Sequence, residues 1–169
     1  KNLYQKMKTY EIDICIITGN ISDKDFSFIP LDNDTLAVAV SNDNPISEFE
    51  SISLEKLRHE KLILRSISSD TRILFESHLK TKNFDISDFN VVLELDNVEV
   101  IKDLVRDNFG VSILSRKSCI KEIKKNKFKL INIDNIDMTR QINLYFHKDF
   151  QFINELKRII SIYNHFLVN

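Results

Sequence analysis

The sequence has very little glycine, proline and cysteine: two residues of each in a chain of 169. Phosphate-binding loops and the strained turn that carries a hydrolase nucleophile need several glycines, so neither is expected. Flexible linkers rich in Gly, Ser or Pro are also missing, so domains joined by such linkers are not predicted. The two cysteines, Cys15 and Cys119, have no partner at the spacing of a metal or redox motif. We therefore expect a reduced, cytoplasmic setting, no metal and no cofactor.

The chain also lacks net charge and long apolar runs. Its 24 Lys and Arg residues balance 25 Asp and Glu residues, which gives a formal net charge of −1. Proteins that hold a duplex through its phosphates carry a strong basic field, so this stretch alone is not expected to bind DNA. No window reaches the ~18 uninterrupted apolar residues of a membrane span, and KNLYQKMKTYE lacks the apolar core of a signal peptide. The sequence thus predicts no membrane association and no export by this segment.

Strand and helix signals alternate along the chain, which favours an α/β architecture with mostly parallel sheets. The apolar, β-branched runs at 12–18 and 36–41 predict buried strands. Ser53 is placed to cap the first helix after them, and Gly110 is the glycine available to end a later helix in a left-handed conformation. Further strands are predicted at 61–65, 90–95, 111–115, 128–133 and 142–147. Helices are predicted at 53–60, 71–80, 97–108 and about 152–167.

The stretch LILRSISSDTRILFESHL, residues 62–79, is predicted to form a strand, a loop and a helix. Backbone N–H groups at the start of such a helix lack intrahelical partners and carry a partial positive charge, so they bind anions readily. The hydroxyls of Ser68, Ser69 and Thr71 can donate to a carboxylate or oxyanion. Ligands of open α/β sheets also lie at the carboxyl ends of the strands. The pattern predicts an anion site, although an ordinary helix cap has the same pattern, and Asp70 would repel an anion if its carboxylate faced the ligand.

Other polar groups give weaker signals. The Thr-Gly-Asn sequence at 18–20 ends the first predicted strand and is explained nearly as well by a plain exit into a loop. The residues at 97 and 98 begin another helix, where Asp96 could equally serve only as the cap. The lysine-rich run 121–127 contains Glu122 and no aromatic residue, so we expect a solvated helix end and no nucleic-acid patch. The histidines lack metal-ligand spacing, and exposed or edge positions are predicted for all four: His59, His78, His147 and His165.

Five segments follow one another in a recognisable order from about residue 10 to the C-terminus. They are EIDICIITG, PLDNDTLAVAVSNDNPI, SISLEKLRHEKLILRSISSDTRILFESHL, NVVLELDNVEVIKDLVRDNFGVSILS and INLYFHKD. Each segment alone is mainly a hydrophobic pattern, but their order and spacing together are specific. In that order they resemble the effector-binding domain of LysR-type transcriptional regulators.

The resemblance implies a two-lobed α/β fold of the type 2 periplasmic-binding-protein kind, with the lobes joined by two crossing strands, LAVAVS and INLYFH. Lobe I would comprise residues 1–40 and 145–169 and would lack its N-terminal part, and lobe II would comprise residues 41–144. A small effector would lie in the cleft between the lobes. The resemblance also implies a winged helix-turn-helix domain, absent from this chain, as the only part that binds DNA. The full-length protein would be a homo-oligomer, either a dimer or a tetramer.

The resemblance also points to the loop after the third predicted strand. In the family this segment reads approximately RxxGSGTR, and the chain matches it at both arginines, at Ser69 and at Thr71, while Ser68 and Asp70 replace the two glycines. A ligand role for the loop is therefore favoured. The expected effector-binding residues are Thr18, Gly19, Asn20, Ser66, Ser68, Ser69, Thr71, Asn97 and Val98.

The sequence is compatible with three functions of different classes. We predict the ligand-sensing regulatory domain of a LysR-type transcriptional regulator, which binds a small anionic effector in order to control transcription. A free-standing solute-binding protein of the same fold is the alternative, and the lack of an export signal counts against it. An enzyme built on this fold is disfavoured because the sequence has no paired catalytic groups.

Overall fold

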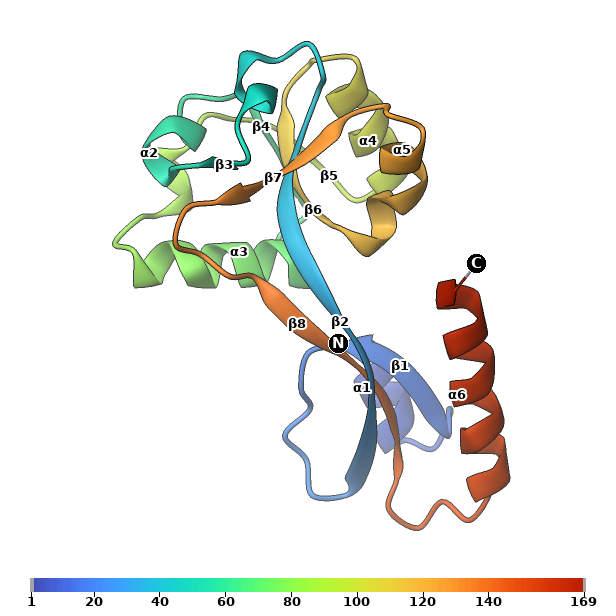
Figure 1. Cartoon of the computed structure of the whole chain (residues 1–169). Helices are drawn as coiled ribbons and strands as arrows, with labels where there is room; N and C mark the ends of the chain where they lie inside the picture. The colour runs from blue at the N-terminus through green and yellow to red at the C-terminus, as the bar shows by residue number, and fades with distance from the viewer. Residues whose placement is uncertain (1, 169) are drawn as a thin grey trace. The chain divides into compact units, whose positions relative to one another are not determined.

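The computed structural model describes residues 2–168, within which strands and helices alternate as the α/β class requires (Figure 1). None of the helices in this range is long and apolar enough to cross a bilayer. The strands are β1 (Ile14–Thr18), β2 (Phe26–Val40), β3 (Ser51–Ile52), β4 (Leu62–Arg65), β5 (Val91–Leu95), β6 (Val111–Ser115), β7 (Lys129–Ile133) and β8 (Thr139–His147). The α-helices are α1 (Asn2–Lys8), α2 (Leu54–Leu57), α3 (Asp70–Thr81), α4 (Val98–Arg106), α5 (Ile120–Lys124) and α6 (Ile153–Val168).

The chain divides into two compact units. Unit 1 comprises the residues up to Asn33 and those from Arg140 onward, and unit 2 comprises Asp34–Thr139. The chain passes from one unit to the other within β2 and again near the start of β8. The predicted lobe boundaries, after residue 40 and before residue 145, lie further along the same two strands.

The sheet of unit 2 has the strand order β2-β6-β4-β5, with β7 also paired to β2. Strand β4 is parallel to both β5 and β6, whereas β2 is antiparallel to β6 and to β7. The sheet is therefore mixed, and the expectation of a mostly parallel sheet is wrong. Parallel neighbours need a crossover connection. Helix α3 forms the crossover between β4 and β5, and α4 forms the one between β5 and β6.

Both faces of this sheet are covered by helices. Figure 1 shows α2 and α3 on one side and α4 and α5 on the other. Successive residues of β4 alternate between the two faces: Leu62 and Leu64 pack in the cluster with Phe75 of α3, and Ile63 packs in the cluster with Ile101 of α4. All five side chains are at most 2% exposed. Burying each contributes roughly 1.5–3 kcal/mol to stability relative to an exposed side chain, and this burial specifies the register of β4.

The apolar side chains of the helices α3 and α6 are only partly buried. In α3, Phe75 and Leu79 are fully buried, but Ile73 is half exposed. Two positions along a helix are about 200° apart around its axis, so Ile73 and Phe75 cannot both face the sheet. In α6, Leu156 is buried while Ile153 in the first turn is half exposed.

The core of unit 1 lies between α1 and the paired strands β1 and β8. Cys15 lies opposite Tyr145 in the antiparallel register and packs with it and with Met7. The prediction of a buried strand is wrong for most of β1: of its five residues only Cys15 is buried, and Ile16 is 41% exposed. The reason is that β1 stands at the end of the strand order, with β8 as its neighbour. Burial raises the pKa of the Cys15 thiol, as it does that of Cys119, and both cysteines are free.

His147 contradicts the prediction that the histidines lie at exposed or edge positions. Its side chain is 6% exposed, and one ring nitrogen, Nε2, lies 2.7 Å from the carbonyl oxygen of Met7. The ring stacks on that of Tyr10, with 4.1 Å between centroids, and also contacts Phe26. Aromatic packing together with a backbone hydrogen bond accounts for the burial of this polar ring.

The turn between α4 and β6 corrects the role assigned to Gly110. The left-handed residue after the helix is Asn108, with φ of 56°, a conformation that asparagine tolerates. Gly110 is needed for space: a Cβ there would lie 2.4 Å from the carbonyl oxygen of Lys61. That carbonyl accepts a 2.8 Å hydrogen bond from the N–H of Val111, so the two backbones are held close together.

We predict that Gly110→Ala lowers the free energy of unfolding by about 1–3 kcal/mol, because the methyl group must displace backbone. The matched variant Asn108→Gly keeps the left-handed turn and should change stability little. Urea denaturation monitored by circular dichroism measures both. A Gly110→Ala protein as stable as the parent would show that the two backbones are not held at this distance.

Candidate functional site

The predicted effector-binding residues of unit 2 gather where β4 and β5 end. These strands are parallel, with Arg65 opposite Leu95, so the loops that follow them emerge side by side. A hydrogen bond from the hydroxyl of Ser66 to the carboxylate of Asp96 joins the two loops. The structure thus brings together the predicted residues that follow each strand: Ser66, Ser68, Ser69 and Thr71 in one loop and helix start, and Asn97 and Val98 in the other.

Helix α3 begins with an unused cap. Ser69 has the extended backbone of an N-cap residue, with φ of −73° and ψ of 129°, yet its side chain makes no capping hydrogen bond. Asp70 is exposed in the first turn. N–H groups of a first turn that a cap does not use are available to another acceptor, and the helix dipole favours an anion there. The Ser69 hydroxyl is likewise not engaged in capping and can donate outward.

Arg72 holds this helix start in place. Its side chain is 8% exposed and forms ion pairs with Glu76 at 2.6 Å and with Glu94 at 2.7 Å. It also donates a 3.2 Å hydrogen bond to the carbonyl of Arg65. The hydrogen bond to Glu94 is the largest cause of the raised pKa of Arg72, and that to Glu76 adds to it. The arginine that matches the family pattern therefore links α3 to β4 and β5, and its donors are largely used within the fold.

Arg65 is the other arginine of the pattern and ends β4. Its Nε is buried and has no hydrogen-bond partner. A buried donor left unsatisfied costs about 1–3 kcal/mol, more when the group is charged, so an acceptor that reached it would be bound favourably. This unsatisfied donor precedes the Ser66–Ser69 loop directly.

Helix α4 begins differently, because its cap is in use. The side chain of Asn97 accepts hydrogen bonds from the N–H of Glu99 at 3.0 Å and of Val100 at 3.4 Å. Asn97 is therefore the cap, and Asp96, the alternative cap residue, is instead bonded to Ser66. Of the two neighbouring helix starts, that of α3 is the one left open to an added acceptor.

In unit 1, the predicted residues lie around an asparagine that the sequence analysis missed. Asn143 of β8 is 0% exposed, and its amide nitrogen donates to the carbonyl of Gly19 at 3.0 Å and to the side chain of Asn20 at 3.2 Å. Its Oδ1 is buried without a partner. Gly19 has φ of 88°, so the chain turns sharply where Thr18 ends β1. The signal available in the sequence was an amide side chain inside the apolar strand INLYFH.

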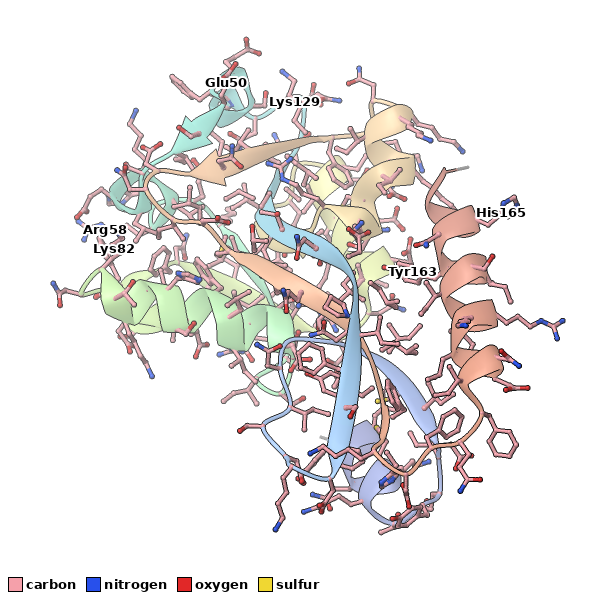
Figure 2. All side chains as sticks on the ribbon, turned by 60° about the horizontal axis from the view of Figure 1, so that its bottom comes forward. Glu50, Arg58, Lys82, Lys129, Tyr163 and His165 are labelled. Atoms are coloured by element: carbon pink, nitrogen blue, oxygen red, sulfur yellow. The ribbon has the colours of Figure 1, made fainter. Side chains whose placement is uncertain are left out.

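Another hollow of unit 2 lies away from these loops. It measures about 580 Å³, and its lining includes Glu50 and Lys129, which Figure 2 labels. Charges of both signs line it. Lys129 already donates to the carbonyl of Ser47 at 3.1 Å, and Arg116 to the side chain of Asn132 at 2.7 Å. The hollow therefore favours no single class of ligand.

The remaining sequence signals add no second site. In the range that the structure describes, no group of three His, Cys, Asp or Glu side chains could hold a metal ion. The lysines of the run 121–127 are exposed in and after α5, as a solvated helix end predicts.

Comparison with known proteins identifies the family. The family model described as the LysR substrate binding domain matches residues 1–162. The chain belongs to this family. A "Probable RuBisCO transcriptional regulator" of Thalassiosira pseudonana is 26% identical over 150 residues, which make up 86% of this chain and 49% of that protein. The chain spans about half the length of the curated relatives it matches. These relatives are named as regulators, which agrees with the prediction that the chain is not an enzyme.

Two solved structures share the fold. The regulatory domain of Synechocystis PCC6803 CcmR in complex with 2-PG superposes with a TM-score of 0.82 at 22% identity, over 95% of this chain and 78% of that chain. The effector-binding domain of QuiR in complex with shikimate gives a TM-score of 0.72 at 22% identity, over 89% and 69%. Both confirm the predicted two-lobed fold class.

We predict that replacing the N-cap residues of α3 and α4 has different effects on stability. Asn97→Ala removes two capping hydrogen bonds and should lower the free energy of unfolding by about 0.5–2 kcal/mol. Ser69→Ala occupies the same position on α3 but loses no capping bond, so its stability should stay within about 0.5 kcal/mol of the parent. Thermal and urea denaturation test the pair. Equal losses in the two variants would mean that Ser69 caps α3 after all.

Proposed function

We propose that this chain is the ligand-sensing domain of a LysR-type regulator and that it binds a small anionic effector in order to control transcription. The observation that carries the proposal is the start of α3, where the N-cap residue Ser69 makes no capping bond. The buried, unsatisfied Nε of Arg65 lies at the end of the strand that leads into the same loop. The start of α3 offers backbone N–H groups and hydroxyls to one acceptor.

The solved neighbours support a small molecule as the effector. CcmR is described with 2-PG and QuiR with shikimate. The regulators among the curated relatives favour this function over a free-standing solute-binding protein. For this chain we propose Ser66, Ser68, Ser69 and Thr71 as the anion-binding residues, with Asn97 and Val98 beside them.

Unit 1 supplies a second proposed set of contacts, Thr18, Gly19 and Asn20. Asn143 adds an unsatisfied acceptor beside these residues, because its buried Oδ1 accepts no hydrogen bond. Satisfying this acceptor removes a penalty of about 1–3 kcal/mol. A ligand group that offers a hydroxyl or N–H donor to this acceptor would therefore be bound favourably.

The regulatory consequence follows from differential affinity. An effector that binds one pose of the lobes more tightly shifts the population toward that pose. We propose that DNA is contacted through a separate N-terminal winged helix-turn-helix domain, and that the full-length protein is a cytoplasmic homo-oligomer, a dimer or a tetramer. Oligomer contacts would then transmit the shift to the DNA-binding domains.

The effector site is tested by titration. A thermal-shift screen of small carboxylates and phosphates selects a ligand, since one present at 100 times its dissociation constant stabilises the fold by about 2.7 kcal/mol. Calorimetry then compares Ser69→Ala and Thr71→Val with the parent. Each variant removes one hydrogen bond to a charged group, worth roughly 1.5–3 kcal/mol, so affinity should fall about 10- to 150-fold.

Asp70→Asn is a control variant that should not weaken effector binding. It removes a negative charge near the bound anion and keeps an oxygen in the first turn, so it should bind as well as the parent or better. If Ser69→Ala and Thr71→Val both keep the parent's affinity, while all melting temperatures agree, the effector is not held at the start of α3.

The charge balance predicts that this chain alone binds duplex DNA weakly. Residues 1–169 alone should show only weak, sequence-independent association with duplex DNA at physiological salt, because the net charge is −1. A gel-shift series over operator and scrambled duplexes measures this. A tight shift confined to one sequence would place DNA recognition inside this chain.

A further inference from the structure

Unit 1 has a hollow that the effector residues do not line. It measures about 270 Å³ and forms between the turn that precedes β1, the end of β8 and the segment before α6. Its lining is limited to aromatic rings, carboxylates and one amide. The lining residues are Tyr10, Asp13, His147, Asp149, Phe150, Gln151 and Phe152. We call it the aromatic hollow.

The rings of the aromatic hollow are arranged in two pairs. Tyr10 stacks on His147, at 4.1 Å between centroids and 7° between planes. Phe150 and Phe152 meet edge to face at 5.6 Å. The outer members of both pairs are open to solvent, with Tyr10 65% and Phe152 64% exposed. Aromatic faces carry partial negative charge, so these rings offer a surface that is apolar and yet attracts cations.

The charged groups of the aromatic hollow are of one sign. Asp13 and Asp149 are exposed carboxylates, and within residues 2–168 neither has a side-chain ion pair or hydrogen bond. Arginine and lysine are absent from the lining, and Lys148, although adjacent in sequence to Asp149, does not contribute to it. A ligand there meets two negative charges and open ring faces, and no competing cation from the lining.

We propose that the aromatic hollow binds the cationic head of a small organic ion, an alkylammonium or guanidinium group. Such a head has an apolar outer surface that suits ring faces and a positive charge that suits carboxylates. A bare metal ion would find two exposed carboxylates and no further anionic ligand, which is a poor set. The volume lies just below that of typical pockets for whole ligands, so the hollow fits a head group.

Two sources supply such a cation: a free amine, or an arginine or lysine side chain of another protein. Calorimetry on the chain with choline tests the first, with 3,3-dimethylbutan-1-ol as its uncharged counterpart of the same shape. The capped tripeptide N-acetyl-Gly-Arg-Gly-amide tests the second. Binding of choline without its uncharged counterpart assigns a free amine, and binding of the peptide alone assigns a side chain. Failure of both at millimolar concentration overturns the proposal.

Two variants test whether the cation binds in the aromatic hollow. Phe152→Leu keeps an apolar side chain but removes a ring face, and affinity for whichever cation binds should fall about 2- to 5-fold. Asp149→Asn removes one charge and should weaken binding by a similar factor, with a smaller loss when salt is added. Both residues are exposed, so the fold should be unaffected.

Matched controls come from unit 2. Phe109→Leu also alters a half-exposed phenylalanine, and Asp43→Asn an exposed carboxylate, and both should bind the cation as the parent does. Equal affinity of Phe152→Leu, Asp149→Asn and the parent would show that the cation binds elsewhere, and would overturn the proposal. Effector binding at α3 is measured with different ligands and variants. The result for the aromatic hollow therefore does not decide whether the effector binds at α3.

Discussion

The ion pairs of Arg72 fix the place on which the proposed effector site depends. One buried guanidinium reaches Glu76 on its own helix, Glu94 on β5 and the carbonyl that ends β4. Three elements therefore meet at the point where the loop begins. Losing the arginine would remove all three of these contacts, and losing both carboxylates would leave a buried charge unpaired.

The two neighbouring helix starts share a position and differ in chemistry. An asparagine caps α4 and satisfies two of its N–H groups, whereas the serine at the same position of α3 satisfies none. A fully capped helix start is a structural element, whereas an uncapped one leaves N–H groups that are suited to binding an anion. This difference depends on side-chain rotamers, which the sequence pattern does not contain.

The sequence predicted what depends on local pattern. The apolar run LILR, the hydroxyl-rich loop and the amphipathic helix after it are local features, and β4 and α3 lie where the pattern places them. Features that depend on distant contacts were missed. The need for a glycine at 110 comes from the Lys61 carbonyl, some fifty residues earlier, and the burial of His147 comes from Tyr10 and Met7. The role of Asn143 arises because β8 pairs with β1, which brings it next to Gly19.

Strand β2 has a consequence for how the protein opens. Its fifteen residues belong to both units: the last third, Leu36–Val40, is almost fully buried, while most residues of the first half are partly exposed. Amide protons of the first half can exchange when unit 1 opens locally, whereas those of Val38 to Val40 exchange only when the core of unit 2 is lost. A single strand would then report two free energies of opening, and the step between them would mark the residue at which one cooperative folding unit gives way to the next.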